Sequence, residues 1–259
     1  MTAQCVWLPC GMKYSVLFIV ACAGGMLMAE NAPEYRARKA FEAESEIDQK
    51  QVHAIRECAV SKIQTCLYPL IGHLKKEGKE NTLLRRESAY SLGHLRAPEA
   101  REPLLALLPK ETEPANKGAV IRALGQIGNK ADIKTISPFL ADPDASLRRI
   151  AARALYDIDD KAASAEVSGK IAGEKDDYTR VEMLNTALQH EGGKVEHALS
   201  LSKILQSSDR AARLRAAEVL GQYKNKEALG DLERALKTER DLQVRAAIFQ
   251  AIQATTLSN

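Results

Sequence analysis

Histidines and paired carboxylates are the residues of this sequence that could serve acid–base or metal chemistry, and their placement argues against both. No motif of a serine hydrolase, a phosphate-binding loop, a dinucleotide site or a zinc protease occurs. The histidines are scattered over different predicted helices: His53, His73, His94, His190 and His197. The carboxylate pairs stand at predicted helix boundaries, where capping explains them: Asp159 with Asp160, and Asp176 with Asp177. We therefore predict a protein that is not an enzyme, with no catalytic residue, no metal and no cofactor.

An apolar run covers residues 14–29, directly after Lys13. A positive charge, an apolar segment and a small residue at its end predict a signal peptide over residues 1–29, with Met12 as an alternative start. A membrane-spanning helix needs about 20 apolar residues, and this run is shorter. Each of three outcomes predicts an exported protein of the bacterial periplasm or cell envelope: cleavage after Ala29, lipidation of Cys22 in a lipobox-like segment, or retention as an anchor.

Removal of the leader would leave two cysteines in the mature chain, Cys58 and Cys66. On one continuous helix they would lie about 12 Å apart along the axis, too far for a disulfide. Pro69 favours the first turn of a helix, so a new helix beginning near Cys66 would bring the two cysteines together. A disulfide and a pair of buried thiols therefore both stay open, and the spacing matches no zinc site.

A repeat of about 32 residues runs through the chain from residue 81 to the C-terminus. Its anchors are apolar residues at successive spacings of 32, 31, 33, 32 and 32: Leu92, Leu124, Leu155, Leu188, Leu220 and Ile252. Nine of the ten residues 12 and 16 positions after the first five anchors are apolar, and their spacing marks one face of a second helix in each unit. We predict six helix pairs over residues 62–259, preceded by an N-terminal extension and capping helix over residues 30–61.

Polar residues recur in the same frame. Residues that can cap a helix stand eleven positions before the anchors: Asn81, Glu113, Asp144, Asp177, Asp209 and Asp241. Basic residues stand seven positions before most anchors: Arg85, Lys117, Arg148, Arg213 and Arg245. Because each basic residue follows its cap residue by four positions, we expect ion pairs along one helix face.

The sequence resembles the short HEAT-like repeats named after the phycobilisome lyases. The resemblance rests on segments in which Leu-Gly-x-apolar follows a basic residue at this period: 85–95, 117–127 and 213–223. It covers about residues 62–255. Tetratricopeptide repeats have a similar period, but their Trp, Tyr and Pro pattern is missing. The resemblance implies an all-α solenoid, and the fourth unit, residues 180–189, departs most from the pattern.

By the same resemblance, the anchor helices line the inner surface of the solenoid. Residues six and two before, and two after, each anchor should then face solvent. The first three units place an arginine-rich set there: Arg86, Tyr90, His94, Arg122, Gln126, Arg149, Arg153 and Asp157. The next two units place acids without arginine: Glu182, Thr186, His190, Glu218 and Gln222. We predict that an anionic protein segment binds the first half of this row.

Other classes of function fit less well. The net charge is only +3 and the sole tryptophan, Trp7, lies in the leader, which argues against nucleic-acid binding. Di-iron hydroxylases of related fold carry His-Glu where this sequence has Arg86-Glu87, and the single His190-Glu191 pair cannot build a two-metal site. The export signal also disfavours a bilin-lyase-like enzyme subunit.

We therefore expect a non-catalytic interaction scaffold or assembly subunit of the cell envelope. In one alternative the protein is a structural subunit that stacks end-on in a larger complex. The apolar-rich segment from Val244 to Ile252 favours that alternative, because we expect no polar capping helix after it to cover its apolar surface.

Overall fold

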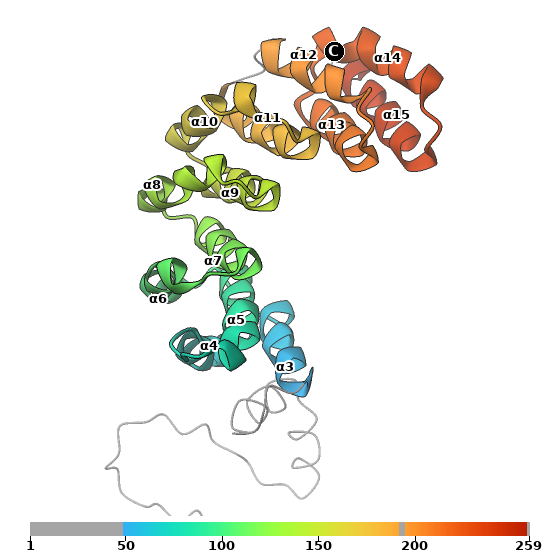
Figure 1. Ribbon diagram of the computed structural model, residues 1–259. Coiled ribbons are helices and arrows are strands. Elements are labelled where there is room, and N and C mark those ends of the chain that lie inside the picture. The colour runs from blue at the N-terminus through green and yellow to red at the C-terminus, as the bar shows by residue number, and fades with distance from the viewer. Residues whose placement is uncertain (1–48, 192–194, 258–259) are drawn as a thin grey trace, which may run out of the picture.

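The computed structural model describes residues 49–191 and 195–257. The predicted signal peptide, the candidate lipidation site Cys22 and the predicted helix break at Gly192 and Gly193 lie outside these residues. The described chain is all-α, with thirteen α-helices, short 3-10 segments and no strand (Figure 1). The predicted fold class is confirmed.

One helix, α3 (Gln49–Val60), precedes six helix pairs. The pairs are α4 (Leu67–Leu74) with α5 (Thr82–His94), α6 (Arg101–Leu107) with α7 (Pro114–Ile127), α8 (Ile133–Ile136) with α9 (Ala145–Ile158), α10 (Lys161–Ser168) with α11 (Asp177–Glu191), α12 (Val195–Ile204) with α13 (Arg210–Tyr223), and α14 (Leu229–Thr238) with α15 (Leu242–Thr256). The 3-10 segments are η1 (Gln64–Cys66), η2 (Lys79–Asn81), η3 (Pro98–Ala100), η4 (Leu108–Lys110), η5 (Lys130–Asp132), η6 (Ser137–Ala141), η7 (Ile171–Gly173) and η8 (Lys226–Ala228).

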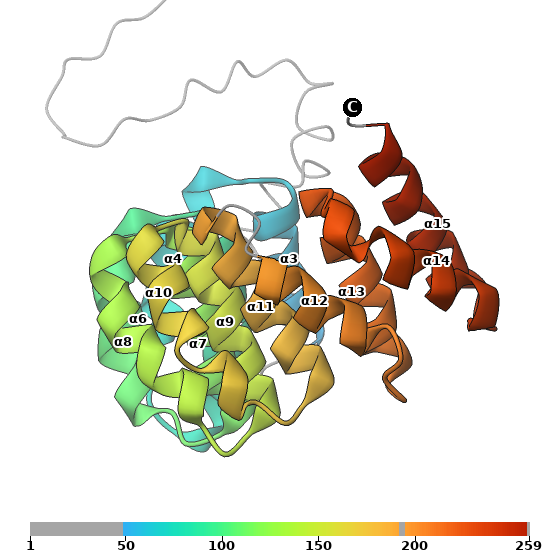
Figure 2. The same cartoon turned by 90° about the horizontal axis from the view of Figure 1, so that it is seen from above.

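The helices form a curved solenoid of two rows. The row of α5, α7, α9 and α11 stacks beside the row of α4, α6, α8 and α10 (Figure 1). Beyond α11 the array turns toward the α5 side, so that α12 to α15 extend to one side of the stack formed by the earlier pairs (Figures 1 and 2). The anchor-bearing helices α5, α7 and α9 therefore line the concave side. Each contacts the next directly, as α13 contacts α15.

The repeat period reflects how closely successive anchor helices pack. The first five anchors are buried, and Ile252 is partly buried. The residue after the anchor is glycine in three units: Gly93, Gly125 and Gly221. At Gly125, a β-carbon would lie 2.5 Å from the Cα atom of Ala154 on α9. Only a residue without a side chain allows this approach, which explains the Leu-Gly signature.

The hydrophobic core divides at the fourth unit. One cluster extends from Ile55 to Val167 and includes Met183, and the other extends from Val181 to Ala251. Helix α11 contacts α9, α10, α12 and α13, so every residue from 181 to 188 is buried. Tyr156 and Gln189 replace the glycine after the anchor on the two sides of this junction.

The predicted helix caps are confirmed in three units. Backbone N–H groups of the first turn donate to three aspartates: Asp144, Asp209 and Asp241. Asn81 and Glu113 make no side-chain capping bond. In the fourth unit Asp177 already lies inside α11, and Asp176 accepts from the N–H of Thr179 at 2.8 Å instead.

The predicted ion pairs between cap residues and basic residues four positions later are wrong for three arginines. Each of these arginines instead binds a glutamate 26 residues further on: Arg85 with Glu111, Arg148 with Glu174, and Arg213 with Glu239. The guanidinium also donates to carbonyl groups of the loop before its own helix, as Arg148 does to Asp142 and Pro143. The arginines thus link consecutive units instead of stabilising a single helix.

Candidate functional site

The predicted binding residues lie on the three anchor helices of the concave side, with different exposure. His94 on α5, Arg122 on α7 and Arg153 on α9 are exposed. The other four are half-buried: Arg86, Tyr90, Gln126 and Arg149. Tyr90 packs against the hydrophobic core, and the Gln126 Oε1 atom lies against Gly93. The exposed arginines, more than Tyr90 and Gln126, are therefore available to a ligand.

Most arginines of the array already have a partner. The Arg149 guanidinium lies over the Tyr178 ring, 5.0 Å from its centroid. The Nε atom of Arg86 lies 3.9 Å from the Glu87 carboxylate, which also accepts from Arg56 at 2.9 Å. By contrast, four exposed arginines form no side-chain hydrogen bond or ion pair with any residue of 49–191 or 195–257: Arg96, Arg122, Arg153 and, between α14 and α15, Arg240.

The charges of Arg96, Arg122 and Arg153 all act on one carboxylate, that of Asp157 on α9. Burial raises the pKa of Asp157, while the positive charges of Arg153, Arg122 and Arg96 act to lower it and the charge of Glu182 acts to raise it. The side chain is nevertheless exposed to solvent. The protein around Asp157 therefore shields this carboxylate from water only in part. Arg96, just after α5, is a member of this set that the sequence pattern missed.

The expected second half of the inner row is wrong for Glu182 and Thr186, which are buried. The Thr186 hydroxyl hydrogen-bonds the Ala152 carbonyl at 2.9 Å. The Glu182 carboxylate accepts from the Nε atom of Arg215 at 3.1 Å. The reason is the turn of the array at α11, which brings α13 over this face.

Other residues of that half bind neighbours within the array. Arg215 also pairs with Glu218 at 3.0 Å, and His190 lies 3.0 Å from Asp159. The Gln222 amide donates to the Tyr156 hydroxyl at 3.2 Å, from α13 to α9. The nearby Tyr223 hydroxyl donates to the Asn185 carbonyl at 3.1 Å, and burial raises the pKa of Tyr223. These contacts connect α9, α11 and α13 at the turn of the array.

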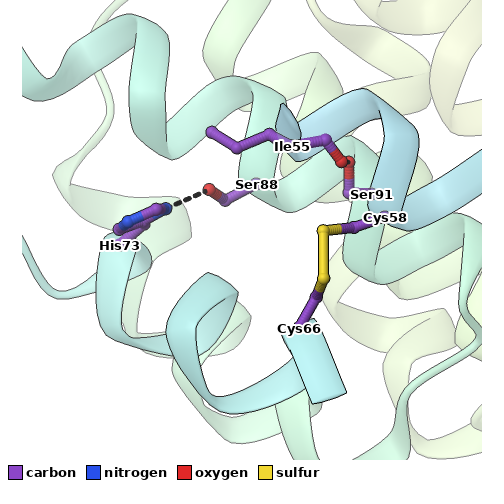
Figure 3. The surroundings of a disulfide bond; sticks show 6 residues. All are labelled: Ile55, Cys58, Cys66, His73, Ser88 and Ser91. Carbon is purple, nitrogen blue, oxygen red and sulfur yellow. Dashed lines mark hydrogen bonds between the residues drawn. A yellow bond between two sulfur atoms is a disulfide. The ribbon is translucent and has the colours of Figure 1, made fainter. Parts of the chain in front are cut away.

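A disulfide joins Cys58 at the end of α3 to Cys66 in η1, with Cα atoms 6.1 Å apart (Figure 3). The helical backbone is interrupted between them at Lys62, whose φ of 51° lies in the left-handed region. Both cysteines are buried. Nearby, the Ser91 hydroxyl of α5 donates to the Ile55 carbonyl of α3 at 2.9 Å. The disulfide therefore fastens α3 to the start of the first helix pair.

A model of HEAT repeats matches residues 67–156, 102–189 and 169–253. The chain belongs to the HEAT repeat family. No curated protein sequence matches it. The HEAT pairs found in the structure are those predicted from the anchor spacing, so the family assignment and the six-pair architecture agree.

Several solved structures of low sequence identity are similar to this chain, and the first of them shares its fold. The complex of CpcE and CpcF of phycocyanin lyase from Nostoc sp. is 16% identical, covers 95% of this chain and 100% of its own, and has a TM-score of 0.58. Human deoxyhypusine hydroxylase in complex with glycerol is 14% identical, with 92% and 100% covered and a TM-score of 0.37. An engineered protein is 18% identical, with 85% and 68% covered and a TM-score of 0.46.

Two features are absent from the described part of this HEAT array. Among residues 49–191 and 195–257, no group of three or more His, Cys, Asp or Glu side chains is placed to hold a metal ion. Over the same residues, no helix is both long and apolar enough to cross a membrane.

Proposed function

We propose that this HEAT array is a non-catalytic scaffold that binds an acidic segment of a protein partner on the concave surface of α5, α7 and α9. The observation that carries the proposal is the group of Arg96, Arg122 and Arg153, which are exposed and unpaired among the described residues. An arginine without an intramolecular partner can form bidentate hydrogen bonds with an incoming carboxylate.

The geometry suits an extended segment. Neighbouring packed helices lie about 8–10 Å apart, so arginines on α7 and α9 can contact carboxylates spaced a few residues apart in the ligand. Arg149 and Tyr178 add a cation–π pair beside them, whose ring can pack on an apolar residue of the same segment. Asp157 weakens the attraction of the arginines for an anionic ligand, because its negative charge competes with the ligand for them.

The test is charge reversal with a defined ligand. A fluorescent peptide of alternating glutamate and leucine is titrated into the full chain and into the Arg122→Glu, Arg153→Glu variant. We expect the variant to lose about tenfold or more in affinity, because attraction becomes repulsion. The matched control reverses two exposed charges on the outer row, Lys203→Glu with Lys237→Glu, and should change affinity far less. Equal losses in both variants would refute the concave site.

A second candidate function, end-on stacking, is favoured by the surface of α15. Three large apolar side chains are exposed there: Leu242 at 81%, Phe249 at 51% and Leu257 at 82%. Arg245 is the one charged residue of α15, and a surface depleted of charge and rich in apolar groups is typical of an interface core. Light scattering of Phe249→Glu tests this candidate, because stacking would be lost only if that face is used.

We also propose that the protein is exported to the periplasm or cell envelope. The supporting observations are the signal-like run over residues 14–29 and the disulfide, a bond that persists in oxidising compartments. Mass spectrometry of the protein from fractionated cells should give a mature chain beginning at Glu30 or a lipid-modified Cys22. An intact Met1 or Met12 terminus in the cytoplasmic fraction would contradict export.

A further inference from the structure

A cavity of about 740 Å³ lies away from the concave surface, between the loop that follows α4 and the helix α6 with η4. Its apolar lining includes Leu74, Pro103, Ala106 and Leu107. Small-molecule sites in proteins have volumes of about 300–1,000 Å³, mostly apolar walls and a few polar groups that orient the ligand. The volume and lining of this cavity fall in that class.

The cavity results from a longer loop in the first repeat. Seven residues separate Leu74 from the start of α5 at Thr82, whereas four separate Leu140 from the start of α9 at Ala145. Gly78, with φ of 91°, allows the extra turn. The corresponding cavity beside α9, next to Arg148 and Glu174, measures about 320 Å³. The cavity of the first repeat is therefore more than twice as large as the corresponding cavity beside α9.

Arg85 shapes the cavity but is not free to bind a ligand. Its Nε atom donates to Glu111 at 2.5 Å, and its Nη1 atom donates to the carbonyls of Lys76 and Gly78, both at 2.9 Å. Glu111 is buried and receives this arginine, so the pair is neutral. The guanidinium thereby holds the long loop open over the apolar lining.

The free charge around the cavity is positive. Four lysines line it, none of them in an ion pair with a described residue: Lys75, Lys76, Lys79 and Lys110. Two exposed carboxylates, Glu77 and Glu113, also line it. The lining therefore carries a net excess of positive charge above an apolar floor, and three of the lysines come from the loop while Lys110 faces them from η4.

We propose that this cavity binds a small amphipathic anion, a molecule with one carboxylate at the end of an aliphatic body. The aliphatic part packs on Leu74, Pro103 and Leu107, which removes apolar surface from water. The carboxylate pairs with the ammonium groups of Lys76 and Lys110 at the mouth. An apolar ligand would leave the lysines without a partner, and an anion without an aliphatic body would leave the apolar lining uncovered.

The test uses decanoate as the probe and titration calorimetry on the full chain. Decanol supplies the same apolar body without the charge, and inorganic phosphate supplies an anion without the body. We expect saturable binding of decanoate at one site and at least about tenfold weaker binding of either partial probe. Decanol binding as tightly as decanoate, phosphate binding as tightly as decanoate, or no decanoate binding would each overturn the proposal.

Variants place the site. Lys76→Gln with Lys110→Gln should weaken decanoate binding about tenfold. The matched control changes two lysines at the smaller cavity beside α9, Lys170→Gln with Lys175→Gln, and should leave the affinity unchanged. Circular dichroism melting confirms that all variants are folded. Equal weakening by both pairs would overturn the proposed position, and Arg122→Glu with Arg153→Glu should not affect decanoate, which separates this site from the concave one.

Discussion

Arg148 and Glu174 form a two-pronged ion pair between consecutive HEAT units, with N–O distances of 2.7 and 2.8 Å. The glutamate also accepts from the N–H groups of Lys175 and Asp176, so one carboxylate binds the backbone before α11 and the arginine of α9 in the preceding unit. Burial acts to raise the pKa of Glu174, but the hydrogen bonds from Arg148 and the backbone outweigh it, and the pKa is lowered. The same pair recurs at Arg85 with Glu111 and at Arg213 with Glu239.

Substitution Arg148→Met should destabilise the array strongly. It leaves the Glu174 carboxylate, only 1% exposed, buried without its partner, a loss of about 3–5 kcal/mol. The matched control is Lys130→Met, whose pair with Asp160 has a lysine side chain 74% exposed, so water screens the pair and its loss should cost far less. Urea denaturation measures both, and equal effects would show that the pair between units is not special.

Gly125→Ala should also destabilise the protein. The added β-carbon would lie 2.5 Å from the Cα atom of Ala154, so α7 and α9 must separate, at a cost of about 1–3 kcal/mol. Gly230→Ala is the control, because nothing lies within 4 Å of its β-carbon position on α14. There we expect a gain of about 0.5–1 kcal/mol from helix propensity. Thermal melting of both variants checks the opposite signs.

Acidification should destabilise the first repeat through His73. Burial, with a contribution from Lys76, lowers the pKa of His73 from 6.5 to about 4, and its Nδ1 atom lies 3.1 Å from the Ser88 hydroxyl (Figure 3). Between these values the unfolded chain binds the proton that the folded chain excludes. Stability is therefore full above pH 6.5 and falls by about 3 kcal/mol as the pH drops to 4. Urea midpoints over this range measure the slope, which His73→Phe should reduce.

Loss of the disulfide should loosen α3 locally. The bridge closes a short loop between Cys58 and Cys66, so Cys58→Ser with Cys66→Ser should cost about 2–3 kcal/mol. In a repeat array each unit depends on its neighbours, so amide exchange should rise in α3 and α4 and stay unchanged in α13 to α15. Uniform acceleration along the chain would contradict this local effect.

Asp157→Asn should strengthen binding of the acidic peptide. The substitution removes the one carboxylate that acts on Arg96, Arg122 and Arg153 together. We expect an affinity gain of about threefold to tenfold at low salt, which decreases as salt screens the charges. Fluorescence anisotropy at two salt concentrations measures it. Unchanged affinity would mean that the ligand does not approach this group.

The array and the exposed arginines of its inner row could be predicted from local patterns. Leu92, Leu124 and the later anchors repeat at a constant period, and each pair of helices is specified by residues close in sequence. Arg122 and Arg153 were placed correctly because their position on a helix follows from the distance to the anchor.

The partners of those side chains could not be predicted in this way. Arg148 was expected to bind Asp144 on its own helix, yet it binds Glu174, because the approach of the next unit decides which carboxylate is within reach. Arg96 follows α5 at a left-handed residue, outside the anchor frame, and joins the concave group only through the curvature of the array.

By itself, then, the sequence determined that the chain folds as stacked helix pairs, where each pair begins, and which face of each anchor helix is apolar. Only the tertiary structure decided where the array turns, that Glu182 and Thr186 are buried, and that a cavity opens at the first repeat. The physical reason is that helix periodicity is local, whereas burial depends on angles between units that add up along the solenoid.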